Sequence, residues 1–241
     1  MSENYNLQKY KVQELKEIAD KMGISPKRNK SVYIETISKA FTEYEEYKKE
    51  KIDKYTKIEQ IGLKGKEGTT YLVKDKKGKE YAMKTFRKTK SSAKLQKEVE
   101  LQEKMSKLGV APKIHDYDVV SKYIVMEKMD RHLFQGKYVL TKEQQKNILD
   151  IFSKLDKGGV LHNDINPLNF MIKKEKIYLI DYGLAKSIDD KLKKKLKTET
   201  PNLKLMTIGF ILKLKELKAD DKSYKYLLKN VSEEDKKNYF L

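Results

Sequence analysis

The stretch between residues 160 and 183 limits the possible folds and functions of this chain more than any other part. A short apolar run leads into His162 and Asp164, and Asn169 follows Asp164 at the spacing D-x-x-x-x-N. Two apolar segments separated by a charged turn come next, and the second ends in Asp181. One carboxylate can accept a proton from a nucleophile, while an amide and a second carboxylate suit Mg²⁺ or Mn²⁺. The pattern therefore predicts two short strands that place a proton acceptor beside a divalent-metal site.

The same stretch resembles two motifs of the protein-kinase fold. His162-Asn163-Asp164 with Asn169 is similar to the catalytic loop H-R-D-x-x-x-x-N, and Asp181-Tyr182-Gly183 is similar to the metal motif D-F-G. The resemblance implies that Asp164 orients an acceptor hydroxyl and takes its proton, and that Asn169 and Asp181 hold the metal bound to ATP. Because D-x-x-x-x-N is common by chance, the rest of the chain has to supply the other parts of the fold.

A glycine-rich turn between two predicted strands is the first of these parts. Gly62, Gly65 and Gly68 recur at every third position, and glycines let a backbone lie close to phosphates. Their spacing departs from the family's G-x-G-x-x-G at its second glycine, and glycine turns in hairpins are ordinary. Lys84, on the next alternating strand, resembles the lysine of the V-A-I-K motif. The resemblance implies that Lys84 contacts the α and β phosphates of ATP.

A helix after this strand should hold the partner of Lys84. Ser91 can cap a helix that runs over residues 94–105 and ends near a glycine. Glu98 is the best match to the glutamate that pairs with the strand lysine in the family. We expect Glu100 and Glu103 to be solvated surface charges.

Two more strands are predicted at residues 111–120 and 123–129, and the second runs into a hinge. By resemblance, Met126 lies behind the adenine pocket, and backbone groups from Glu127 to Met129 bind the adenine edge. His115 is interpreted as a structural residue near the hinge.

The resemblance implies an α+β, two-lobed protein-kinase-like fold. The β-rich N-lobe and hinge are assigned to residues 51–129 and a minimal helical C-lobe to residues 130–241. A helix is predicted at 141–157 and an apolar helix at 201–217, with a basic stretch at 189–197 in place of an activation segment. Only 58 residues follow Gly183 (241 minus 183), and they contain no A-P-E motif. This brevity resembles compact atypical kinases, such as the RIO and tRNA-modification-associated groups and small kinases of large DNA viruses.

Three substitutions depart from the family pattern. Asn163 replaces the arginine that pairs with a phosphorylated activation loop, which predicts activity without such phosphorylation. Asn166 replaces a lysine that neutralises the γ-phosphate, which predicts slower turnover or a different phosphate cradle. Tyr182 replaces the usual phenylalanine, and we expect it to keep the same packing role.

Residues 1–50 form a separate segment with two predicted amphipathic helices, at 10–22 and 32–41. The segment resembles a SAP-type helix-extended-helix module, which implies DNA or RNA binding through Lys27, Arg28 and Lys30. Thr36 departs from that pattern, because a basic residue is frequent there. A packing or protein-docking extension is the alternative interpretation.

The chain of 241 residues contains 54 Lys and Arg against 36 Asp and Glu, giving a net charge of +18. This charge fits either a solvated lysine-rich surface or a polyanion-binding protein. The absence of cysteine excludes disulfides, thiolate chemistry and cysteine-based zinc sites. No apolar run is long enough to span a membrane, and the N-terminus is unlike a secretory signal. We expect a monomer in the cytoplasm or nucleus, or in the host cell or virion if the protein is viral.

The expected function is that of an ATP- and Mg²⁺-dependent serine/threonine protein kinase that is directed to nucleic acid or nucleoprotein. Its partner would be a protein with a Ser or Thr acceptor, and membrane binding is not expected. Two alternatives remain. One is a small-molecule kinase of the aminoglycoside or sugar type, and the other is a non-catalytic nucleic-acid-binding protein with a kinase fold.

Overall fold

The computed structural model describes residues 19, 24–25, 29–52, 54–62, 65 and 67–241. The chain forms two compact units. The first comprises Met1–Thr56 with Asp75–Lys77, and the second comprises Lys57–Lys74 with Gly78–Leu241. Among the described residues, no helix combines the length and the apolar composition needed to cross a membrane.

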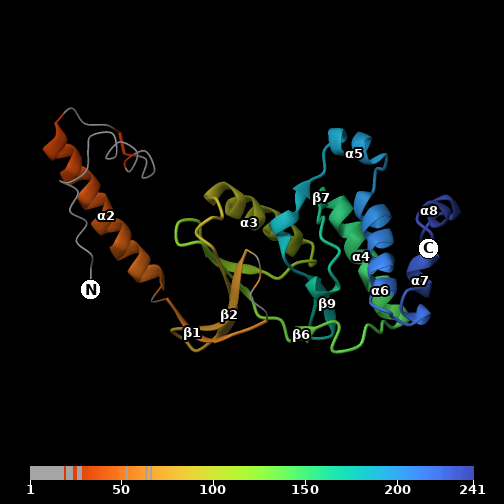
Figure 1. Ribbon diagram of the computed structural model, residues 1–241. Coiled ribbons are helices and arrows are strands. Elements are labelled where there is room, and N and C mark those ends of the chain that lie inside the picture. The colour runs from red at the N-terminus through yellow and green to blue at the C-terminus, as the bar shows by residue number, and fades with distance from the viewer. Residues whose placement is uncertain (1–18, 20–23, 26–28, 53, 63–64, 66) are drawn as a thin grey trace. The chain divides into compact units, whose positions relative to one another are not determined.

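The first unit contains helix α2, Lys30–Ile52, which is longer than the helix predicted at 32–41 (Figure 1). At its start, the Asn29 side chain accepts hydrogen bonds from the backbone N–H and the hydroxyl of Ser31. Beyond the apolar residues the sequence is rich in Lys and Glu and has no glycine or proline. Residues of this kind favour a helix, so α2 continues after its apolar face ends.

Much of the predicted nucleic-acid module lies outside the residues that the structure describes. The first predicted helix lies outside the described residues except for Ala19, which is helical and buried. Lys27 and Arg28 also lie outside them. Lys30 is exposed at the first position of α2. The SAP-like resemblance and its DNA or RNA contacts therefore stay predictions.

Five strands form the N-lobe sheet in the order β1-β2-β3-β5-β4 (Figure 1). The β2–β3 and β3–β5 pairs are antiparallel, and their register places Lys84 between Thr70 and Ile124. Lys84 is thus on the central strand, where its backbone is held from both sides. The strands are β1 Tyr55–Gln60, β2 Gly68–Asp75, β3 Glu80–Phe86, β4 Ile114–Asp118 and β5 Tyr123–Glu127.

Helix α3, Ser92–Lys107, packs against this sheet as the sequence predicts. Ser91 is its N-cap and accepts a hydrogen bond from the backbone N–H of Lys94. The chain leaves the helix through Gly109, whose φ of +68° favours glycine. Five buried residues of α3 and of the sheet form a hydrophobic cluster: Ala82, Leu95, Val99, Ile124 and Met126.

The C-lobe contains helix α4, Lys142–Lys157, which opens with a capping box between Thr141 and Gln144. Gly158 caps its end, and Gly159 turns the chain with a φ of +63°. Short strands before and after α4 form the sheets β10-β7 and β6-β8-β9. These strands are β6 Arg131–His132, β7 Val160–Leu161, β8 Phe170–Lys173, β9 Lys176–Leu179 and β10 Lys186–Ser187.

The last part of the chain is helical, and it differs from the predicted pattern in two places. The basic stretch predicted at 189–197 forms helix α5, capped by the Asp189 side chain, which accepts a hydrogen bond from the Leu192 N–H. The apolar helix predicted at 201–217 begins with a π-helical turn, Asn202–Met206, before α6. The helices are α5 Asp190–Leu196, α6 Thr207–Glu216, α7 Lys225–Leu228 and α8 Glu233–Asn238.

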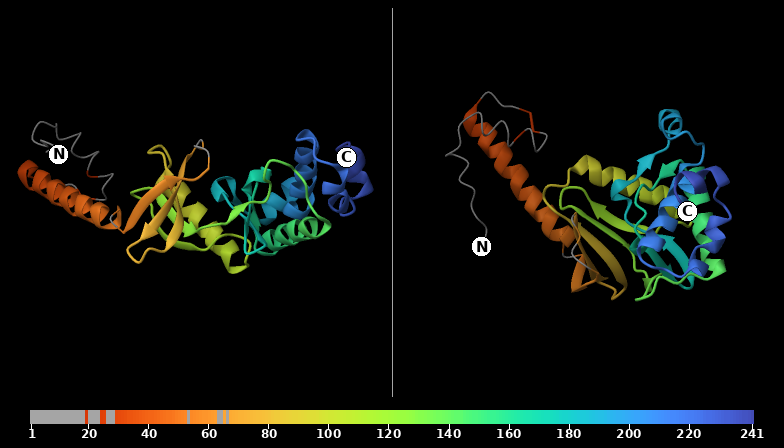
Figure 2. Two further views of the ribbon diagram at one scale, coloured as in Figure 1. Left: turned by 90° about the horizontal axis from the view of Figure 1, so that it is seen from below. Right: turned by 45° about the vertical axis from the view of Figure 1, so that its right-hand side comes forward.

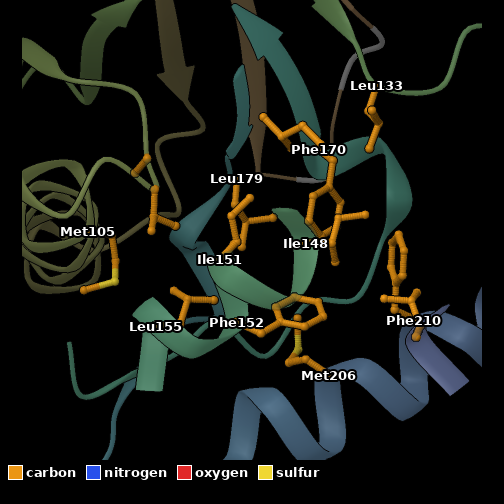
Figure 3. Close-up of a cluster of buried hydrophobic side chains, with 14 of the residues drawn as sticks. Met105, Leu133, Ile148, Ile151, Phe152, Leu155, Phe170, Leu179, Met206 and Phe210 are labelled. Atoms are coloured by element: carbon orange, nitrogen blue, oxygen red, sulfur yellow. The ribbon is translucent and has the colours of Figure 1, made fainter. Parts of the chain in front are cut away.

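The core of the C-lobe combines aliphatic and aromatic side chains, and Phe152, Phe170 and Phe210 are among them (Figure 3). The Phe170 ring lies 5.0 Å from the Phe210 ring and 6.2 Å from the Phe152 ring, measured between centroids. In Figure 2 the green helix α4 lies beside the blue helices near the C-terminus. It also contacts β7, β9 and the π-helical turn. Because Phe170 directly follows Asn169, this packing fixes one end of the loop that contains the predicted metal ligand.

The predicted α+β, two-lobed, protein-kinase-like fold is confirmed. A sheet with one helix is followed by a helical part. Lys84 and Glu98 lie on β3 and α3, and the other residues of the candidate site lie in the turns between the short strands of the C-lobe.

Candidate active site

Lys84, Glu98 and Asp181 meet although they come from a strand, a helix and a loop. The Lys84 ammonium donates to Glu98 Oε1 at 2.8 Å and to Asp181 Oδ1 at 2.8 Å. The Glu98 side chain is only 2% exposed, while that of Asp181 is 45% exposed. The lysine therefore links a buried anchor on α3 to a carboxylate that solvent can reach.

The charges of this triad stabilise one another. Burial on its own lowers the pKa of Lys84, but Glu98 and Asp181 reverse this and raise the pKa to about 12. Burial on its own raises the pKa of Asp181, but the Lys84 ammonium outweighs it and holds the pKa below the usual 3.8. Both groups are consequently charged at neutral pH.

The backbone of Asp181 has a left-handed conformation, with φ 66° and ψ 77°. Such a conformation is unfavourable for residues other than glycine and is concentrated at functional sites. Here it follows directly after β9 and Ile180, and the Gly183 N–H donates to Asp181 Oδ1 at 3.4 Å. The strained turn thus directs the carboxylate toward Lys84.

Two hydrogen bonds fix the orientation of the Asp164 carboxylate. Its Oδ1 accepts from the Asn166 backbone N–H at 3.0 Å, and its Oδ2 accepts from Asn169 Nδ2 at 2.9 Å. Because Asn169 uses its amide nitrogen here, its Oδ1 atom is the one that would ligate a cation. No group of three His, Cys, Asp or Glu residues in the described ranges could hold a metal ion. Asn169 with Asp181 nevertheless fits Mg²⁺, which takes one or two protein oxygens plus phosphate and water.

His162 joins the catalytic loop to the strand that precedes Asp181. It is fully buried, and its Nδ1 and Nε2 atoms each lie 3.0 Å from a carbonyl oxygen, of Asp164 and Ile180 respectively. Its ring also meets the Tyr182 ring edge-on, with 4.9 Å between centroids. Burial lowers the pKa of His162, so the ring is neutral near pH 7. These contacts suit the predicted supporting role.

The family model for the protein kinase domain matches residues 55–235, well over half of the chain. The chain belongs to the protein kinase family.

Three curated relatives show which kinases this one is similar to. The probable bifunctional tRNA threonylcarbamoyladenosine biosynthesis protein of Methanosarcina barkeri is 30% identical over 121 residues, or 50% of this chain and 22% of that protein. The probable serine/threonine-protein kinase BUD32 homolog of Archaeoglobus fulgidus is 32% identical over 68 residues, or 28% of this chain and 34% of the relative. The dual specificity protein kinase Ttk of Danio rerio is 31% identical over 85 residues, or 32% of this chain and 9% of the relative. This kinase thus spans 22% of the first relative and 34% or less of the others. The resemblance to compact atypical kinases is confirmed, while the similarity to viral kinases stays a prediction.

A pair of side chains that the sequence patterns missed anchors the catalytic loop of this kinase. Asn202, at the start of the π-helical turn, is fully buried, and its Oδ1 accepts from the His162 backbone N–H at 3.1 Å. Its Nδ2 donates to Asp156 Oδ1 at 2.7 Å and to the Val160 carbonyl at 2.8 Å. Asp156 also accepts from the backbone N–H groups of Asn202 and Leu203. The only sign of this role in the sequence is that Asn202 is a polar residue at the start of a predicted apolar helix.

Lys90 is another residue that the patterns missed. Its ammonium donates to Glu98 Oε2 at 2.8 Å and to Glu67 Oε2 at 2.7 Å. It lies in the irregular segment between β3 and α3, where neither periodicity nor a motif distinguishes it from neighbouring lysines.

The three glycines of the predicted phosphate loop play different structural roles. Gly62 has a φ of +77°, which favours glycine. A Cβ on Gly68 would lie 2.0 Å from the Thr85 carbonyl oxygen, so only glycine fits against β3. The Gly65 N–H donates to the Gly68 carbonyl at 2.9 Å. Residues 63, 64 and 66 lie outside the described part of the loop, and phosphate binding by these glycines stays a prediction.

The hinge retains the predicted order, with Met126 buried on β5. The Glu127 N–H donates to the Lys113 carbonyl at 2.8 Å, and its carboxylate accepts from Lys173 at 2.7 Å. Adenine binding by the segment Glu127 to Met129 would therefore use its remaining backbone groups. His115 packs edge-on against Tyr81, 4.9 Å between centroids, beside this segment.

Proposed function

We propose that this kinase transfers the γ-phosphoryl group of ATP to a Ser or Thr hydroxyl of a protein, with Mg²⁺ or Mn²⁺ as cofactor. One observation supports this most strongly, namely the meeting of Lys84, Glu98 and Asp181 at 2.8 Å contacts. Asp164 and Asn169, 2.9 Å apart, complete the set of side chains that phosphoryl transfer requires.

Each residue has a role that follows from its contacts. Lys84, held by Glu98, would orient the α and β phosphates, and Asn169 and Asp181 would hold the metal. The metal would neutralise charge on the phosphates. Asp164, fixed by Asn166 and Asn169, would orient the acceptor hydroxyl and take its proton late in the reaction.

Asn166 affects the expected rate of phosphoryl transfer and the choice between a protein and a small-molecule acceptor. Its Oδ1 accepts from the Leu168 N–H at 3.0 Å and caps the short 3₁₀ helix Pro167–Asn169. It therefore serves the backbone of the loop and supplies no positive charge to the γ-phosphate. We expect slow turnover, and the small-molecule acceptor remains the second candidate for this reason.

The experiment is transfer of labelled γ-phosphate from ATP, with Mg²⁺, to casein, to histone and to the protein itself. We expect incorporation on Ser and Thr that is lost in Lys84→Ala, Asp164→Asn and Asp181→Ala. Lys97→Ala is the matched control, because Lys97 is exposed on α3 next to Glu98. Transfer to an aminoglycoside or sugar, but to no protein, would instead establish the small-molecule kinase. Absence of any transfer or ATP binding by folded protein would contradict the proposal.

We further propose that residues 1–50 and the basic surface direct the kinase to nucleic acid. The net charge of +18 supports this, as does the tRNA-related name of the Methanosarcina relative. Both DNA and tRNA belong among the polyanions to be tested.

A further inference from the structure

The carboxylate of Glu67 lies at the metal motif although it belongs to the glycine-rich loop. A Cβ built on Gly183 would be 2.8 Å from Glu67 Oε2, 3.3 Å from Asp181 Oδ1 and 3.4 Å from Glu98 Oε2. Three carboxylates therefore gather around Gly183, next to the place where the phosphates of a nucleotide are expected.

Two lysines form ion pairs with these three carboxylates. Lys84 binds Glu98 and Asp181, while Lys90 binds Glu98 and Glu67. The two oxygens of Glu98 are divided between the lysines, Oε1 to Lys84 and Oε2 to Lys90. Both ammonium groups also lie over the same Phe86 ring, at 4.9 and 5.0 Å from its centroid.

Burial and hydrogen bonds hold Lys90 in place, as they do Lys84. Its side chain is 5% exposed, and its N–H donates to the Arg87 carbonyl at 3.0 Å. The Arg87 N–H in turn donates to the Glu67 carbonyl at 2.9 Å, so backbone and side-chain contacts both join Lys90 to the loop. A lysine this buried, with two carboxylates, is not one of the solvated lysines that give the chain its charge.

We propose that Lys90 is a second positioning lysine of the nucleotide site. It holds Glu98 through Oε2, the oxygen that Lys84 does not bind, and it neutralises Glu67 so that this carboxylate does not repel the phosphates. This inference rests on the proposed function, because it requires that the chain bind ATP at Lys84 and Asp181.

The test compares binding of Mg²⁺·ATP with binding of adenosine by calorimetry, using the full chain. Lys90→Met leaves the Glu67 charge unbalanced near the phosphates and should weaken ATP binding about tenfold. Adenosine has no phosphates, so its affinity should not change. Lys90→Arg should retain ATP affinity, and Glu67→Gln added to Lys90→Met should recover a large part of the loss. Lys88→Met, in the same segment but exposed, is the matched control.

Several outcomes would overturn the inference. Equal weakening of ATP and adenosine binding by Lys90→Met would show that Lys90 only maintains the fold. Failure of Glu67→Gln to restore ATP binding in a folded double variant would refute the charge argument. Glu67→Gln alone removes a negative charge beside the phosphates and should tighten ATP binding, and weakening there would also refute it, even if Lys90→Met does not fold. If the wild-type protein binds no ATP, the proposed function fails instead.

Discussion

Tyr182 places a polar hydroxyl in the buried, apolar part of the metal motif. It is buried against His162, and its hydroxyl has no hydrogen-bond partner among the residues that the structure describes. Burial raises the pKa of this phenol, so the hydroxyl stays neutral and unsatisfied. A buried polar group without a partner lowers stability.

Tyr182→Phe should therefore raise the free energy of unfolding by about 1 kcal/mol. The ring and its edge-on contact with His162 remain, so kinase activity should be kept. Urea unfolding and the labelled-phosphate assay would measure the two effects. A less stable variant would mean that the hydroxyl has a role in the folded state.

Asp181 gives a prediction about pH. Its folded pKa lies below 3.8, so the stability that it contributes is complete above that value and is lost as the pH falls through the folded pKa. Asp181→Asn should lower the free energy of unfolding at pH 7 by up to about 1 kcal/mol, because the side chain is partly exposed. The difference from wild type should shrink as the pH falls below 3.8, as urea titrations can measure. A difference that persists in acid would contradict the assignment of the effect to charge.

At the scale of elements, the polar contact between α4 and the π-helical turn positions the catalytic loop. Asn202→Asp would place two carboxylates side by side, since Asn202 Nδ2 lies 2.7 Å from Asp156 Oδ1. We expect a loss of about 3–5 kcal/mol of stability, as for other buried unpaired charges, together with loss of activity. The exchanged pair, Asp156→Asn with Asn202→Asp, should recover part of both, because one amide again faces one carboxylate while the donation to the Val160 carbonyl stays lost. A double variant no better than Asn202→Asp would show that the contact is not the cause.

The elements that the sequence predicts well are those with local signals. Ser91, Thr141 and Gly158 cap helices where the pattern places the ends. The spacing of the motifs also places Lys84, Glu98, Asp164, Asn169 and Asp181 on the elements where the structure has them. The π-helical turn, Asn202 and Lys90 were not predicted, because their contacts join segments far apart in the chain. Helix α2 was predicted too short, since the apolar period ends before the helix does.

At the scale of the whole molecule, charge is the feature that distinguishes this kinase. With a net charge of +18, the full chain should bind DNA or tRNA with an affinity that falls steeply as salt rises. If Lys27, Arg28 and Lys30 contact phosphates, replacing all three with alanine should reduce the salt slope by up to about 3. Fluorescence anisotropy at several salt concentrations would measure this. Triple substitution of exposed lysines elsewhere, Lys94, Lys97 and Lys107, is the control. An unchanged slope would locate the binding outside residues 1–50.

The two oxygens of Glu98 bind different lysines, and this arrangement affects how we expect the kinase to be regulated. Many kinases are switched off by swinging the helix that bears this glutamate away from the active site. Here such a swing would strip Glu98 from Lys84 and Lys90 together, and separating a buried ion pair costs about 3–5 kcal/mol. We therefore expect the inactive arrangement to be a minor population. Asn163, moreover, replaces the arginine that would dock an activating phosphate. We expect such a kinase to need no activating switch, and we expect the cell to regulate it through its abundance and its access to substrates.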